Sequence, residues 1–126
     1  LPHVTVLPMG RAPINVNTAT EEVLQSLTAT LSDQQAKTLV EQKEEKPWKT
    51  LAEFESDPLI SASGLKKDYL SVNSEFFEIA TRISLSDRIV RLASLIYRNN
   101  NDGTMQVISR DQSQKYLITK EKVALP

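Results

Sequence analysis

The chain has 126 residues, enough for one domain or for one domain with a small subdomain around a hydrophobic core. Its 40% hydrophobic and 25% charged residues are ordinary for a globular domain, and its net charge of −1 gives no global electrostatic case for binding nucleic acid or anionic lipid. The absence of cysteine excludes disulfide and thiolate chemistry. No apolar run approaches the roughly 20 residues of a membrane span. Because the chain begins with Leu1 rather than Met, we expect a fragment or a processed product of a longer protein.

The first 14 residues are predicted to be an extended lead-in. Pro2, Pro8 and Pro13 fall within them, and proline at this density blocks a helix. The charges then divide the chain in two. Residues 1–73 carry 10 acidic and 7 basic residues, whereas residues 74–126 carry 6 acidic and 8 basic ones. The division favours two structural parts.

Residues 15–73 carry the signals of a compact helical subdomain. Three capping boxes, in which a Ser or Thr side chain and a Glu or Gln side chain satisfy each other's backbone N–H groups, precede apolar stripes of helical spacing. They are Thr18 with Glu21, Ser32 with Gln35, and Thr50 with Glu53. The third helix is predicted to stop near Asp57, because Pro58 disfavours helical geometry at the residue before it. The predicted core of this subdomain is Leu24, Leu27, Leu39, Trp48 and Phe54.

Residues 74–126 change to a strand pattern. From Phe77 to Leu85 apolar and polar residues alternate, which predicts a half-buried strand. Residues 88–98 fit either a strand or a helix, and the Asn-Asn-Asn-Asp-Gly run at 99–103, a strong turn signal, favours a strand–loop–strand arrangement. Residues 104–108 and 116–119 are predicted strands. The fold class is therefore α+β, with an antiparallel sheet after the helices.

Catalytic chemistry is poorly supported. The one histidine, His3, lies in the proline-rich lead-in, and the three glycines form no phosphate-binding loop. Glu41, Glu44 and Glu45 alternate with lysines, as on a solvated helix face. Asp102 beside three asparagines lacks the acidic ladder of a calcium loop. We predict no catalytic residues, no cofactor and no enzyme activity.

The Ile-Asn-Val-Asn-Thr-Ala segment at 14–19 resembles the start of helix-hairpin-helix DNA-binding modules of the competence-protein type. In that family a glycine-rich hairpin follows the first helix, so that backbone N–H groups reach a phosphate. Here the corresponding residues, Leu27 to Ser32, contain no glycine. The subdomain is therefore similar to that fold but lacks the glycine-rich hairpin that binds the DNA phosphate.

A second resemblance covers nearly the whole chain. Residues 14–19, the Pro-Trp-Lys-Thr-Leu-Ala-Glu-Phe segment at 47–54, Asp57-Pro58 and residues 70–77 are similar to the C-terminal part of the periplasmic domain of the minor pseudopilin K family, also called general secretion pathway protein K, of bacterial type II secretion systems. In that family a helical insertion interrupts a pilin-like domain, and the chain then returns to finish the sheet. A switch to strands directly after Ser74 fits this arrangement.

The resemblance implies a structural role. It implies an N-terminal helix outside this sequence that anchors the protein in the inner membrane of a Gram-negative bacterium, with the globular part in the periplasm. It implies a place at the pseudopilus tip with two other minor pseudopilins, of the I and J type, and no nucleic acid. Family members can bind calcium in the helical domain, but no ligand set is matched here, and metal ligands stay unknown. Phe76 is the candidate partner-facing residue.

We therefore predict a tip subunit of the type II secretion pseudopilus that supports secretion of folded proteins across the outer membrane. The alternative is a helix-hairpin-helix nucleic-acid-binding module. A third option is an enzyme with a carboxylate site in a cleft between the two parts.

Overall fold

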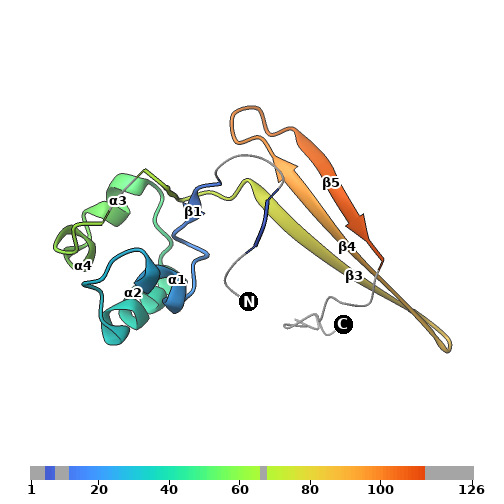
Figure 1. Cartoon of the computed structure of the whole chain (residues 1–126), viewed down its shortest axis with the longest axis horizontal. Coiled ribbons are helices and arrows are strands. Elements are labelled where there is room, and N and C mark those ends of the chain that lie inside the picture. The colour runs from blue at the N-terminus through green and yellow to red at the C-terminus, as the bar shows by residue number, and fades with distance from the viewer. Residues whose placement is uncertain (1–4, 8–11, 66–67, 113–126) are drawn as a thin grey trace. The chain divides into compact units, whose positions relative to one another are not determined.

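The computed structural model describes residues 5–7, 12–65 and 68–112. They fold into two compact units, which divide between Ser74 and Glu75. The first unit is helical and the second is a three-stranded antiparallel sheet, so the predicted α+β class is confirmed (Figure 1). Of the predicted lead-in, residues 5–7, 12 and 13 have no regular secondary structure. His3 and the predicted strand at 116–119 lie outside the described residues.

The helical unit is closed by a short parallel sheet that joins its two ends. Strand β1, Ile14–Asn15, pairs with β2, Leu70–Ser71. Between them lie the helices α1 (Glu21–Ser26), α2 (Asp33–Glu45), α3 (Leu51–Glu55) and α4 (Pro58–Ser61). Pairing residues 56 positions apart brings the start and the end of the unit together, and a compact helical head results (Figure 1).

The core of this unit lies between the helices. Its buried side chains are Val16, Ala19, Leu24, Leu31, Ala36, Leu39, Trp48, Phe54, Ile60 and Leu70. Four of the five residues predicted for the core are among them, and the fifth, Leu27, packs against this cluster while partly exposed. The Trp48 and Phe54 rings meet edge to face, with centroids 4.9 Å apart.

The predicted cap of the first helix is wrong. Thr18 is not its N-cap: the Thr18 hydroxyl donates to the Asn15 carbonyl at 3.3 Å, within a turn that follows β1. The N-cap is Thr20, whose side chain accepts from the Val23 N–H at 3.4 Å. Glu21 is the first helical residue, so its carboxylate stands at the positive end of the helix instead of reaching back to Thr18.

The other two caps involve the predicted residues. Ser32 and Gln35 form a reciprocal capping box at the start of α2. Thr50 accepts from the Glu53 N–H at the start of α3, but the Glu53 carboxylate accepts from the Lys49 N–H, one residue before the cap. The bond to Lys49 N–H, with help from the Lys46 ammonium 3.6 Å away, lowers the pKa of Glu53.

Pro58 does not end the helical region. Helix α3 stops at Glu55, and Asp57 then caps a further short helix, α4, by accepting from the Leu59 N–H at 2.9 Å. Proline is favourable at the first helical position, where its missing N–H would have had no helical partner. The predicted break near Asp57 is therefore correct, but the helix α4 that starts at Pro58 was not predicted.

The second unit is a meander. Strand β3, Phe76–Leu85, pairs along its whole length with β4, Arg88–Arg98. Strand β5, Met105–Asp111, pairs with β4 only from Ala93 to Arg98, with a bulge between Leu95 and Ile96. The far half of the β3–β4 hairpin is therefore two-stranded among the described residues (Figure 1). Positive φ angles at Ser86 and Gly103 turn the chain at the two hairpin loops.

Candidate interaction surfaces

The segment that corresponds to a DNA-binding hairpin, Leu27 to Ser32, has its hydrogen bonds directed into the protein. The Leu27 and Thr28 N–H groups donate to carbonyls of α1. The Thr30 N–H donates to the Thr28 hydroxyl, and the Ser32 N–H donates to Gln35. The hydroxyls of Thr28 and Thr30 both donate to the Ser63 carbonyl, at 3.0 and 3.1 Å. These groups are occupied by the fold and are not directed at a phosphate.

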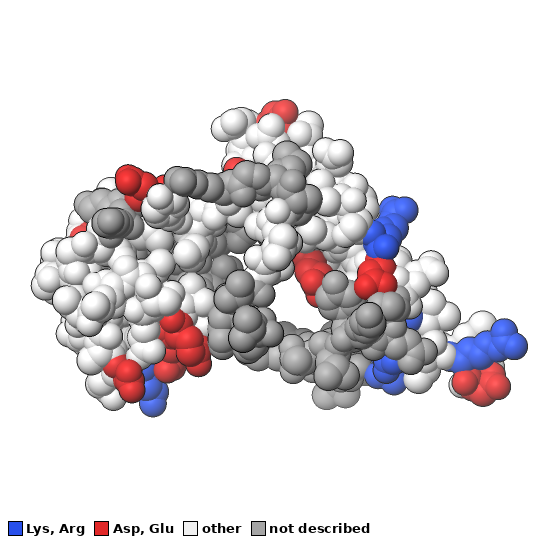
Figure 2. All heavy atoms as spheres, in the orientation of Figure 1, with Lys and Arg blue, Asp and Glu red and all other residues white. Residues whose placement is uncertain are grey.

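The charge of the helical unit agrees with this geometry. Over this unit, the charged side chains visible in Figure 2 are mostly acidic, and they form no continuous basic patch. A phosphate backbone is bound chiefly by clustered Lys and Arg. Neither the loop nor the charge distribution supports the nucleic-acid alternative.

One face of the β3–β4–β5 sheet is apolar. Residues directly opposite in an antiparallel ladder share a face, so the register defines its members. This apolar face comprises Phe77, Ile79, Thr81, Ile83, Leu85, Arg88, Val90, Leu92, Ser94, Ile96, Arg98, Met105, Val107 and Arg110. It holds three arginines and no carboxylate.

The apolar face is exposed, which corrects the prediction of a half-buried strand. Ile79 is 50% exposed, Ile83 59% and Leu85 74%. The alternation in the sequence does place these side chains on one side, but none of the described residues covers them. Toward the loop end of this face is a cavity of about 260 Å³, where the Arg98 guanidinium lies 4.9 Å from the centroid of the Phe77 ring. An apolar area of this extent is typical of a contact surface.

The opposite face is mixed in character and contains the candidate partner-facing residue. This mixed face comprises Phe76, Glu78, Ala80, Arg82, Ser84, Ile89, Arg91, Ala93, Leu95, Tyr97, Gln106, Ser109 and Asp111. Phe76 stands directly opposite Tyr97, with ring centroids 5.2 Å apart, and both are partly exposed. Tyr97 was not predicted, because its place beside Phe76, 21 positions earlier, follows from the register of β3 and β4.

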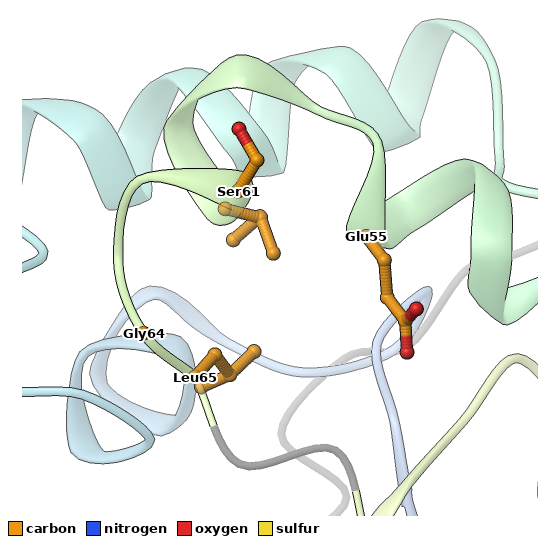
Figure 3. A pocket seen from close by; sticks show the side chains of 5 residues that line it. Glu55, Ser61, Gly64 and Leu65 are labelled. Atoms are coloured by element: carbon orange, nitrogen blue, oxygen red, sulfur yellow. The ribbon is translucent and has the colours of Figure 1, made fainter.

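The helical unit has a small cavity of about 210 Å³ beside α4. Its lining residues are Glu55, Ile60, Ser61, Gly64 and Leu65. In Figure 3 the side chains of Ser61, Glu55 and Leu65 stand around this space from different sides. The lining combines one carboxylate, one hydroxyl and aliphatic side chains, and the Ser61 hydroxyl donates to the Pro58 carbonyl at 3.2 Å.

In the described part of the chain, no group of three or more His, Asp or Glu side chains is placed to hold a metal ion. Asp102, in the β4–β5 loop, instead accepts from the Thr104 hydroxyl at 2.7 Å and from its N–H at 2.9 Å, and these bonds lower the pKa of Asp102. None of the described helices is long and apolar enough to cross a membrane.

Comparison with known proteins agrees with this architecture. Residues 14–73, the helical unit with its two closing strands, match the family model described as type II secretion system (T2SS), protein K. The chain is 30% identical over 114 residues to the type II secretion system protein K of Pseudomonas aeruginosa, covering 90% of this chain and 33% of that protein. It is 28% identical over 116 residues to the protein of the same name from Pectobacterium carotovorum, covering 87% and 35%. The chain thus spans about a third of the length of these relatives.

A solved structure shares the fold. The GspK-GspI-GspJ complex of the enterotoxigenic Escherichia coli type 2 secretion system contains a chain that matches 86% of this one, with a TM-score of 0.54 and 19% identity. The match covers 39% of that chain. The chain is thus similar in sequence to the type II secretion system protein K family and similar in fold to a chain of the GspK-GspI-GspJ complex.

Proposed function

We propose that this chain is part of a minor pseudopilin at the tip of a type II secretion pseudopilus, where it supports the secretion of folded proteins across the outer membrane. The observation that carries the proposal is the order of the two units: a helical unit matching the protein K family, followed by an antiparallel sheet with an exposed apolar face. The role is assembly and not catalysis. The E. coli chain of similar fold comes from the structure of a GspK-GspI-GspJ complex, which supports association with other pseudopilins.

The two units have separate tasks in this proposal. The sheet completes a pilin-like domain, and its apolar face packs against the part of the protein that lies outside this sequence. The helical unit caps the filament, because a wide helical head leaves no room for another subunit above it. The full-length protein is anchored in the inner membrane by an upstream helix, with these units in the periplasm. It is not an enzyme, and Phe76 faces a partner subunit.

The test is assembly. The full-length protein carrying this chain is co-expressed with the I- and J-type pseudopilins of the same organism, extracted in mild detergent and purified by a tag on one subunit. We expect a stable complex of the three proteins, and a deletion of the gene is expected to stop secretion while the exported proteins accumulate in the periplasm. Association with neither pseudopilin would refute the proposal. Steeply salt-dependent binding to duplex DNA would favour the alternative instead.

A further inference from the structure

The loop between β4 and β5 holds the only aspartate or asparagine in the sequence that is followed by a glycine, Asp102–Gly103. Both residues are exposed, and Gly103 has a φ angle of 73°. A glycine has no side chain to shield its backbone nitrogen, so this nitrogen is open to reaction with the preceding carboxyl group. Asp87, in the turn between β3 and β4, is also exposed but precedes Arg88. The two hairpin turns therefore differ in their chemistry.

The reaction available to this pair is an isomerisation that needs no enzyme and no cofactor. The backbone nitrogen of Gly103 attacks Cγ of Asp102, and the new C–N bond closes a five-membered succinimide ring. The carboxyl hydroxyl leaves as water together with the proton of the nitrogen. Water then opens the ring at either carbonyl. Opening at Cγ restores aspartate, and opening at the backbone carbonyl gives isoaspartate, in which the chain continues through the side-chain carbon.

The folded loop holds both reacting groups on other partners. Oδ1 of Asp102 accepts from the Thr104 hydroxyl at 2.7 Å and from the Thr104 N–H at 2.9 Å. The Gly103 N–H donates to the Asn99 carbonyl at 2.9 Å. The bonds from Thr104 also lower the pKa of Asp102 and keep its carboxylate ionised. An ionised carboxylate has no hydroxyl to release, so it closes the ring slowly.

We propose that Asp102–Gly103 is a site of spontaneous isoaspartate formation, and that Thr104 restrains the reaction while the loop is folded. Isoaspartate lengthens the backbone by one methylene group, inside a loop closed by the bond from the Asn99 N–H to the Thr104 carbonyl at 2.9 Å. The next pair along the hairpin is Arg98 with Met105, and both line the cavity at the loop end of the apolar face. Modification of the loop therefore loosens this end of the apolar face.

The first test compares the folded chain with the unfolded one. Wild-type protein is aged at physiological temperature and near-neutral pH, either in buffer or in guanidinium chloride, and is then digested. Isoaspartate leaves the mass of a peptide unchanged but alters its chromatographic retention, and an isoaspartyl methyltransferase labels it. We expect isoaspartate at Asp102 and none at Asp87. It should form at least about fivefold more slowly in the folded chain, because the reaction there waits for the loop to open.

The second test changes the residue that restrains the reaction. Thr104→Val keeps the β-branched shape but removes the hydroxyl that donates to Asp102. Each unit by which the pKa of Asp102 then rises increases its protonated fraction tenfold, so we expect isoaspartate to form about two- to tenfold faster in the folded variant. Thr104→Ser keeps a hydroxyl and is expected to keep the slow wild-type rate. In guanidinium chloride, where the loop is absent, all three proteins are expected to react equally fast.

The outcomes separate the site from its restraint. Circular dichroism verifies that both variants are folded before they are aged. Absence of isoaspartate at Asp102 in the unfolded chain would overturn the site itself. Equal rates in the folded and unfolded wild type would overturn the restraint by the loop. A wild-type rate in folded Thr104→Val, or an equal acceleration by Thr104→Ser, would overturn the role of the Thr104 hydroxyl.

Discussion

The side chain of Asn17 takes the place of a backbone pairing partner for Trp48. Its Oδ1 accepts from the Trp48 N–H at 3.0 Å, and its Nδ2 donates to the Trp48 carbonyl at 2.9 Å. A weaker bond of 3.4 Å joins Nδ2 to the Val72 carbonyl. Asn15, two residues earlier, accepts from the Asn17 N–H and donates to the Ser74 hydroxyl. The two asparagines therefore tie the start of the helical unit to its middle and its end.

Removing this amide is expected to destabilise the helical unit. Asn17→Ala leaves the N–H and carbonyl of Trp48, a residue that is only 8% exposed, without these partners. At about 1 kcal/mol for each hydrogen bond, with a further cost for polar groups left buried, we expect a loss of about 2–3 kcal/mol. Tryptophan fluorescence during urea unfolding measures it directly. Asn73→Ala is the control, since Asn73 is exposed and its described bond uses only the backbone N–H; an equal loss in both variants would contradict this assignment.

Alanine substitutions of the two threonines before α1, Thr18 and Thr20, are expected to reduce stability by different amounts. Thr20→Ala removes the capping acceptor, and we expect a loss of about 0.5–1 kcal/mol, at the low end for a cap because the bond is 3.4 Å long. Thr18→Ala removes only a bond to the Asn15 carbonyl and is expected to cost less. Urea unfolding of the two variants compares them. A larger loss of stability in Thr18→Ala than in Thr20→Ala would indicate that Thr18 is the N-cap.

These comparisons show which features local sequence predicts. Caps at Ser32 and Thr50, the helical stripes and the strand alternation depend on residues within four positions of each other, and the structure has the corresponding elements. The cap was wrongly assigned to Thr18 because Thr20, two residues later, also has a hydroxyl that can cap the helix. The Thr18 hydroxyl instead donates to the Asn15 carbonyl, in the turn after β1. The pairing of Ile14 with Leu70 is parallel and distant in sequence, and no local pattern encodes it.

The exposure of the apolar face could not be predicted from the sequence, for a different reason. The alternation from Phe77 to Leu85 indicates that one side of the strand is apolar. It does not indicate what covers that side. The same limit applies to Phe76, whose neighbour Tyr97 is selected by the β3–β4 register. Surfaces of this kind become visible only when the strands are paired.

Lys43 should make the free energy of unfolding depend on pH in the alkaline range. Its residue is only 8% exposed, its ammonium donates to the Ala19 carbonyl, and desolvation lowers its pKa although the nearby Glu44 carboxylate acts in the opposite direction. Between the lowered pKa and the ordinary value of 10.5, the unfolded chain binds more protons than the folded one. The free energy of unfolding therefore rises with pH in that window.

The measurement compares wild type with Lys43→Met, which keeps the aliphatic stem and cannot titrate. As pH rises toward 10.5, the unfolding free energy of wild type is expected to increase relative to that of the variant. Lys37→Met, on the exposed side of the same helix, controls for the loss of one charge. A difference that stays constant or falls across this window would show that the folded state does not lower the pKa of Lys43.

The exposed apolar face should make this 126-residue chain associate with itself or bind hydrophobic dyes. Ile79→Thr/Ile83→Thr keeps β-branched side chains in the strand and removes apolar surface from two residues that are 50% and 59% exposed. At about 1 kcal/mol for each replacement, association through this face should weaken by about 2 kcal/mol, or roughly 30-fold in the dissociation constant. Sedimentation velocity over a concentration series measures the association, and dye fluorescence reports the exposed surface. Ala80→Thr introduces the same residue on the mixed face and is expected to leave both readouts unchanged. If that control lowered association as much as the double variant, the contact would not belong to the apolar face.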